Sequence, residues 1–146
     1  MAFAQDLSDS RCFRIVGKIR LEWAIRRQYA RRRRRNGSVK LADEDIKTRE
    51  VLDWEGLHFF QFIFSSGAPK LRIFLALKGV DYESHEIDLM TNENLKDYFL
   101  GINPRGLLPA IVHDGDVHIE SNDILTYLES VYPEPRLIPE GAEDKV

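Results

Sequence analysis

The sequence predicts an α/β fold with a mixed four-stranded sheet, one half parallel and the other half antiparallel. Three observations in the second half of the chain predict this fold. They are a strand–helix–strand order over residues 57–89, an Asp114-Gly115 turn between two short apolar runs, and a helical pattern that begins near Ser121. A chain of 146 residues with 43% hydrophobic residues is long enough for one ordinary core. We therefore expect one globular domain, preceded by an extension.

The first 56 residues differ in composition from the rest and are predicted to form that extension. Residues 1–40 contain twelve Lys and Arg against three Asp and Glu, whereas residues 41–146 contain nine against twenty-one. Apolar side chains at helical spacing predict a basic helix over residues 13–35. Residues 39–56 are acidic and mixed, which is typical of a short solvated helix or a linker. We place the domain boundary at Gly56.

The next segment predicts a strand, a helix and a second strand. Residues 57–64 are an aromatic-rich run of strand length, which the turn at residues 65–69 ends. The helix has Pro69 in its first turn and Gly79 at its end, and three apolar residues form its buried side: Leu71, Phe74 and Leu75. Lys78 and the other charged residues are expected on its outer side. Residues 82–89 predict a second strand, joined to the first by a right-handed parallel crossover.

The remaining segment predicts a helix, a hairpin and a last helix. Residues 92–101 repeat apolar side chains at helical spacing, and Asn103-Pro104 ends that helix. Residues 110–113 and 116–119 are joined by Asp114-Gly115, a pair favoured in tight antiparallel turns. Ser121 can cap the last helix. The resulting βαβ-α-ββα order over residues 57–140 is the thioredoxin-like layout.

Composition and motifs exclude several classes of function. The only cysteine, Cys12, allows neither an intramolecular disulfide nor a zinc cluster, so a reducing cytoplasmic location is expected. No apolar run is long enough for a membrane span. The four histidines do not follow a metal-ligand spacing, and we assign them no role; His113 and His118 are expected at the surface.

The arginine run at residues 31–35 is open to two interpretations. It can contact phosphates or an anionic membrane, or it can be a solvated arm without a specific partner. Nothing beside it is suited to reading bases, so no specific nucleic-acid partner is predicted.

Three short segments are candidates for a binding site: Ser65-Ser66, Leu108-Pro109 and Glu120-Ser121. The first and last lie at helix N-termini, where free backbone N–H groups attract anions. A cis peptide bond before Pro109 would turn the backbone of Leu108 outward, free to pair with a peptide-like ligand. In the predicted layout the three segments come together, and a small anionic peptide fits them.

At these residues the sequence resembles the N-terminal domain of glutathione transferases, and most closely the serine-type classes such as zeta and tau. The resemblance covers residues 57–140 and rests on the order and spacing of several short motifs: Ser65-Ser66, Leu71-Arg72-Ile73, residues 75–79, residues 103–106, Pro109 and residues 120–124. It implies residues 141–146 to be a stub of a missing helical domain. That domain normally provides most of the pocket for the electrophile.

The resemblance implies a role for each candidate residue. Ser65 would donate a hydrogen bond to the sulfur of glutathione, the co-substrate, and favour the thiolate. Leu108 would hold the cysteinyl part of glutathione through its backbone. Glu120 and Ser121 would hold the γ-glutamyl group. Ser66 replaces Ser65 if the alignment is off by one residue, and no metal is required.

Each of these roles has a structural alternative. The serines and Glu120 can simply cap helices, and Pro109 can be a trans proline that opens an edge strand. Two departures also matter. Gly67 stands where some classes carry a thiol, and Leu107 stands where many members have a polar residue, which removes one contact to glutathione.

Two classes of function therefore remain open. One is an enzyme of detoxification, in which the glutathione thiolate attacks a small electrophile. The other is a binding module that holds glutathione or a protein partner without turnover. We expect the isolated chain to be a poor transferase that self-associates through an apolar helix face. We also expect the first 50 residues to be dispensable for glutathione binding.

Overall fold

The computed structural model describes residues 40–139 and residue 141. The predicted basic helix at residues 13–35, the arginine run and Cys12 lie outside the described residues. Among the described residues, no helix is long and apolar enough to cross a membrane.

The core of the molecule is a four-stranded mixed sheet with the order β2-β1-β3-β4. The strands are β1 (Leu57–Gln61), β2 (Glu83–Glu86), β3 (Ala110–His113) and β4 (Asp116–Ile119). β1 pairs parallel with β2 and antiparallel with β3, and β3 pairs antiparallel with β4. The predicted thioredoxin-like layout is therefore confirmed.

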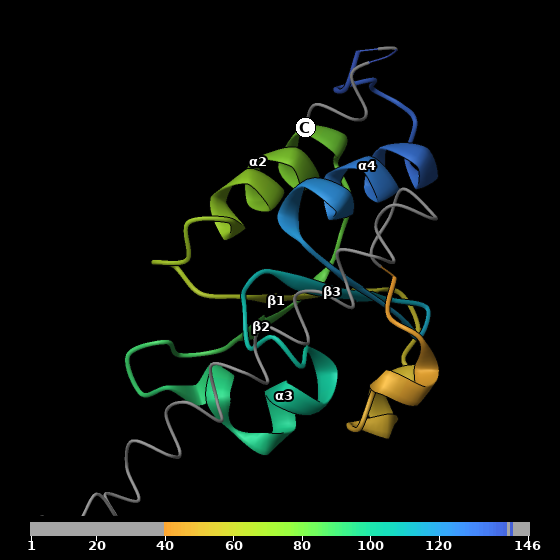
Figure 1. The fold of residues 1–146 in the computed structure, drawn as a ribbon. Helices are drawn as coiled ribbons and strands as arrows, with labels where there is room; N and C mark the ends of the chain where they lie inside the picture. The colour runs from red at the N-terminus through yellow and green to blue at the C-terminus, as the bar shows by residue number, and fades with distance from the viewer. Residues whose placement is uncertain (1–39, 140, 142–146) are drawn as a thin grey trace, which may run out of the picture.

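Helices cover the two faces of the sheet differently. α2 (Ala68–Lys78) and α4 (Ser121–Val131) lie side by side on one face, whereas α3 (Asp97–Ile102) lies on the other (Figure 1). Short 3₁₀ turns complete the second layer: η1 (Asp43–Asp45), η2 (Arg49–Asp53) and η3 (Glu93–Leu95). Because both faces are covered, the first four residues of β1 are all buried.

The local predictions of turns and helix ends are largely confirmed. Asp114 and Gly115 both have positive φ, 50° and 80°, as a tight hairpin turn requires. α2 has Pro69 in its first turn and ends at Gly79, whose φ of 64° is left-handed. The predicted helix over residues 92–101 is instead η3 and α3, separated by the extended Lys96. The short helix α3 is sufficient to fill this part of the core because its large buried side chains are Phe99 and Ile102.

The predicted solvated linker at residues 39–56 is wrong. Leu41, Ile46 and Val51 are almost completely buried and belong to the same apolar cluster as Phe60 and Phe99. The backbone N–H of Leu41 donates to the Val117 carbonyl at 2.9 Å, which adds a bridge to the β4 edge. The packed domain therefore begins by residue 40 rather than at residue 57, and we no longer expect residues 40–50 to be dispensable.

Lys78 is buried, contrary to its predicted outer position. Its Nζ donates to the carbonyl oxygens of Tyr132 and Pro135 at 2.6 and 2.7 Å, and it lies 2.9 Å from a carboxylate oxygen of Glu129. Burial alone would raise the pKa of Glu129, but the hydrogen bond from Lys78 and backbone N–H donors lower it below the ordinary value. The ion pair joins the C-terminal end of α2 to α4, and the two hydrogen bonds join it to the segment after α4.

Candidate functional site

The turn between β1 and α2 brings Ser65 against a distant part of the chain. Ser65 is buried, and its hydroxyl donates to the Leu108 carbonyl at 3.3 Å. Hydroxyl hydrogen bonds are usually about 2.8 Å long, so this contact is weak. A weak bond leaves the hydroxyl able to turn toward a ligand.

Gly67 allows the third candidate segment, Glu120-Ser121, to lie next to Ser65 and Pro109. A Cβ built on Gly67 would lie 2.7 Å from Pro109 Cδ and 3.4 Å from Ser121 Cβ. The absence of a side chain therefore lets the turn, the proline and the start of α4 pack closely. The three candidate segments meet, as the sequence predicted.

The capping interpretation of the serines is wrong. The N-cap residues are Gly67 for α2 and Glu120 for α4, and neither helix has a side-chain cap hydrogen bond. Ser121 is the first helical residue of α4 instead of its cap. The N–H groups of both first turns therefore lack a capping side chain, and the positive ends of two helix dipoles face one location.

The peptide bond between Leu108 and Pro109 is cis, as expected. Within the described residues, the Leu108 N–H has no hydrogen-bond partner and the Leu108 carbonyl accepts only the weak bond from Ser65. Pro109 immediately precedes β3. One backbone N–H and one carbonyl next to the sheet are thus available to a peptide-like ligand.

Two basic side chains, Arg105 and Lys70, contact the Glu120–Asn122 segment. Glu120 has a left-handed φ of 71° and its carboxylate accepts a hydrogen bond from Arg105. Lys70 donates to the Asn122 side chain at 2.6 Å, which links the first turns of α2 and α4. Arg105 belongs to the motif at residues 103–106 on which the family resemblance rests, and that motif was the sequence signal that could have identified it as a site residue.

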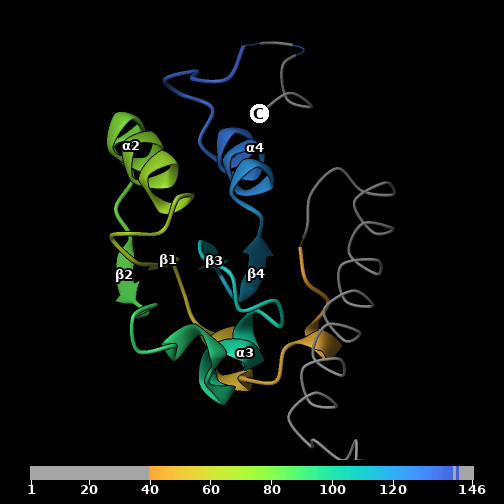
Figure 2. The same cartoon turned by 60° about the vertical axis from the view of Figure 1, so that its left-hand side comes forward.

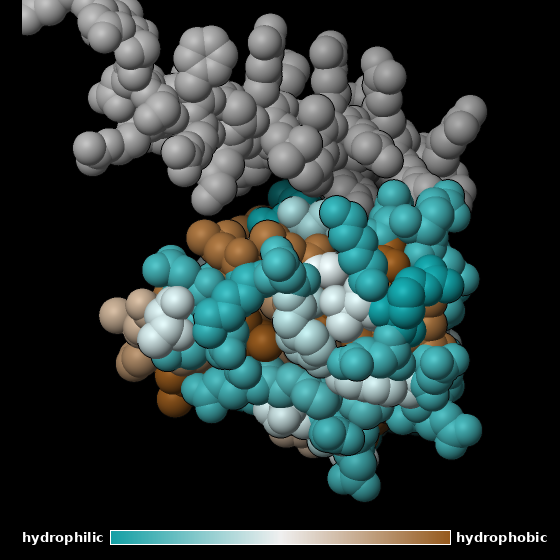
Figure 3. Space-filling model, turned by 90° about the horizontal axis from the view of Figure 1, so that it is seen from below, coloured by the Kyte–Doolittle hydropathy of each residue, from teal (hydrophilic) through white to brown (hydrophobic). Residues whose placement is uncertain are grey.

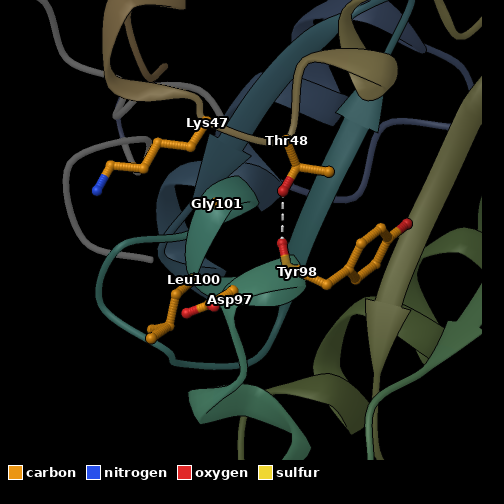
Figure 4. Close-up of a pocket in the computed structure, with 6 residues that line it drawn as sticks. All are labelled: Lys47, Thr48, Asp97, Tyr98, Leu100 and Gly101. Carbon is orange, nitrogen blue, oxygen red and sulfur yellow. Dashed lines mark hydrogen bonds between the residues drawn. The ribbon is translucent and has the colours of Figure 1, made fainter.

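A surface hollow lies elsewhere and contains none of the candidate residues. It is lined by six residues from the η1–η2 connection and α3: Lys47, Thr48, Asp97, Tyr98, Leu100 and Gly101 (Figure 4). The Thr48 hydroxyl donates to the Tyr98 carbonyl at 2.7 Å across it. Figure 3, which shows the molecule from the α3 side, shows a mostly hydrophilic surface with apolar patches. None of the candidate residues is among the described residues that line this hollow, and we therefore keep the Ser65 region as the candidate site.

Comparisons with known proteins show which family the domain resembles. Residues 64–131 match the family model of the glutathione S-transferase N-terminal domain. Glutathione S-transferase Z1 of Arabidopsis thaliana is 45% identical over 86 residues, which are 58% of this chain and 38% of that protein. A maleyl pyruvate isomerase described as a bacterial zeta-class glutathione S-transferase shares 38% identity at a TM-score of 0.56, covering 60% of this chain and 42% of that chain.

A further similar structure was solved with bound glutathione. A glutathione transferase homologue from Lodderomyces elongisporus, solved with two GSH per subunit, is 30% identical at a TM-score of 0.52, over 60% of this chain and 44% of that chain. The chain spans about two-fifths of the length of the relatives named here. The likeness therefore concerns one domain of those proteins.

Proposed function

We propose that this chain, which resembles the N-terminal domain of zeta-class glutathione S-transferases, binds glutathione at the junction of α2, α4 and Pro109. The observation that carries the proposal is the convergence of two uncapped helix N-termini on the free backbone of Leu108. Glutathione is a small peptide with two carboxylates and one thiol. Its carboxylates match the helix N-termini, and its peptide backbone matches an unpaired N–H and carbonyl.

Each candidate residue has a proposed contact in this arrangement. The Leu108 backbone pairs with the cysteinyl residue of glutathione. Ser121 and Glu120 receive the γ-glutamyl end, where the Glu120 carboxylate contacts the amino group while Arg105 holds that carboxylate in place. Ser66 is exposed and provides a second hydroxyl beside Ser65.

We propose that Ser65 activates the bound thiol. Its hydroxyl donates only a long bond to Leu108, so it can redirect that bond to a thiolate sulfur. A donor to the sulfur and a nearby helix N-terminus both stabilise the thiolate over the thiol. The thiolate then attacks a small electrophile, such as an activated double bond.

Calorimetric titration of the full chain with glutathione tests the binding site. Glu120→Ala and Ser121→Ala should each weaken binding about tenfold or more, because each removes a hydrogen bond to a charged group. Ser130→Ala, near the other end of α4, is the matched control and should bind like the parent. Equal affinities of all variants would show that glutathione does not occupy this junction.

A titration of the thiol tests the role of Ser65 separately. Ser65→Ala should raise the pKa of bound glutathione, measured from ultraviolet thiolate absorbance, while leaving binding nearly intact. Ser66→Ala is the paired variant. If only Ser66→Ala raises the thiol pKa, Ser66 is the activating residue; if neither does, activation by this turn is refuted.

A binding module without turnover is the second candidate function. The observation that favours it is the outward side of α2, where Ile73 and Leu77 are largely exposed. Apolar helix faces of this kind bind a second domain, a partner or a second copy. Glutathione binding without conjugation of a chromogenic electrophile, together with self-association, would support the module over the enzyme.

A further inference from the structure

The parallel pairing of β1 and β2 brings together two histidines and a glutamate that no sequence motif connects. His58 pairs with Glu83 in the parallel register, and His85 follows two residues later on the same side of β2. This cluster is at the start of β1, whereas Ser65 follows the end of β1, so the two sites are at opposite ends of the strand. β2 is an edge strand of the sheet (Figure 2), and the Glu83 side chain on it is largely exposed.

The ligand atoms of the three side chains face one another. His58 Nδ1 is 3.0 Å from His85 Nε2 and 3.6 Å from one oxygen of Glu83, whose other oxygen is 3.7 Å from His85 Nε2. Zinc binds nitrogen and oxygen ligands at about 2.0–2.2 Å, so ligands of a tetrahedral ion are about 3.4 Å apart. The observed separations lie on either side of that value, and small side-chain adjustments would equalise them.

The protein orients His58 as it would orient a metal ligand. His58 Nε2 is 3.0 Å from the Glu55 carbonyl oxygen, which can only accept a hydrogen bond. Nε2 therefore carries the proton of the neutral ring, and the lone pair of Nδ1 is directed at the cluster. Metal-bound histidines typically donate their second ring N–H to a carbonyl or carboxylate in this way.

Aromatic rings hold both imidazoles in place. Trp54 packs on His58 and His85 with ring centroids 4.4 and 5.0 Å away, and Phe60 stacks on His85 at 4.8 Å. His58 is nearly buried, whereas the Glu83 side chain is largely exposed. Two ligands are thus fixed by packing, and the carboxylate is free to close on an ion from the solvent side.

We propose that His58, Glu83 and His85 form a binding site for a divalent transition metal, with Zn²⁺ as the ion that fits best. Two imidazoles and one carboxylate are a known zinc ligand set, which leaves the fourth tetrahedral position to water. Borderline ions prefer imidazole, whereas Mg²⁺ and Ca²⁺ prefer all-oxygen sites. A bound ion would clamp β2 to β1 independently of glutathione.

Fluorescence of Trp54 provides a local test in the full chain. In a Trp23→Phe background Trp54 is the only tryptophan, and Co²⁺, which adopts similar tetrahedral sites, should quench it saturably because the ring stacks on both ligands. Added Zn²⁺ should compete and restore the emission. Calorimetry with Zn²⁺ should give one site for this cluster.

Variants of the two accessible ligands decide the proposal. Glu83→Gln and His85→Gln should each weaken Zn²⁺ binding at least tenfold, since even outer partners of a metal site contribute about tenfold. Glu86→Gln on the same strand and His113→Gln are matched controls that should bind like the parent; circular dichroism confirms that each variant is folded. Failure to quench Trp54 saturably, or equal affinity in Glu83→Gln, His85→Gln and the controls, would overturn the proposal.

Discussion

The two faces of the sheet are covered by different kinds of structure. α2 and α4 cover one face with eleven-residue helices that have regular apolar spacing. The other face is covered by the six-residue α3 and by 3₁₀ turns from residues 43–53. Both faces of the sheet are buried at its centre. Phe59 packs toward α2 and α4 and Phe60 packs toward α3, and neither side chain is exposed to solvent.

The comparison shows that a complete core does not require regular helices. On the α3 face, Leu41, Ile46 and Val51 reach the core from a segment whose average composition is acidic. Three apolar side chains at irregular spacing can complete the core on this face when hydrogen bonds hold the backbone between them in place. Lys47 and Thr48 both donate such bonds to the Gly101 carbonyl, at 2.7 and 3.2 Å.

The largest expected effect comes from removing apolar side chains of that segment. Leu41→Ala with Ile46→Ala should destabilise the protein by about 2–5 kcal/mol for each residue, because each leaves a core cavity. That sum approaches the whole stability of an ordinary domain. Urea unfolding followed by circular dichroism measures it.

The matched control lies on the other face, at the exposed positions of α2. Ile73→Ala with Leu77→Ala should change the free energy of unfolding by no more than about 0.5 kcal/mol per residue. A small effect of the Leu41 and Ile46 substitutions would mean that residues 40–56 are a dispensable cover.

A smaller effect, on the α4 face, depends on pH. His118 was expected at the surface, but it is buried against Tyr127, with ring centroids 3.7 Å apart. Burial lowers its pKa to about 4; the nearby Asp116 raises the pKa, and Lys40 and His113 lower it. In the unfolded chain the pKa is about 6.5. Between these values the unfolded state binds the extra proton, so stability falls as pH decreases from about 6.5 to 4.

The pH dependence can be measured against a variant without the titrating group. Full protonation should cost the parent up to about 3 kcal/mol, since one pKa unit corresponds to about 1.4 kcal/mol. His118→Phe preserves the stacking on Tyr127 and should remove most of this loss from urea unfolding curves recorded over the same range. Equal losses in parent and variant would assign the pH dependence to other groups.

The smallest expected effect concerns the close contact on the α3 face. A Cβ on Gly101 would lie 2.1 Å from Thr48 Oγ1 and 2.8 Å from the Thr48 backbone nitrogen. Gly101→Ala should therefore destabilise the protein by about 1–3 kcal/mol through overpacking, despite the better helix propensity of alanine. Thermal unfolding provides the measurement.

The reverse substitution, alanine to glycine, at an exposed position of α2 is the control for Gly101→Ala. Ala76 is exposed in the last turn of α2, and Ala76→Gly should cost up to about 1 kcal/mol through propensity alone. If Gly101→Ala raised the melting temperature instead, the contact between residues 47–48 and α3 would not limit packing at that position.

Elements with local signals could be predicted from the amino-acid sequence. The positive φ of Asp114 and Gly115, the end of α2 at Gly79 and the order of strands and helices along the chain all follow from neighbouring residues. The three segments of the proposed glutathione site were also predictable, because helix N-termini and an X-Pro bond have sequence signals. Their roles in binding remain proposals.

Contacts between residues far apart in the chain could not be predicted from the sequence and are known from the folded structure. The burial of Leu41 and Lys78, the ion pair between Arg105 and Glu120, and the grouping of His58 with Glu83 and His85 depend on strand register and on the packing of distant segments. The physical reason is that local spacing fixes backbone conformation, whereas burial and side-chain pairing depend on which surface another part of the chain covers.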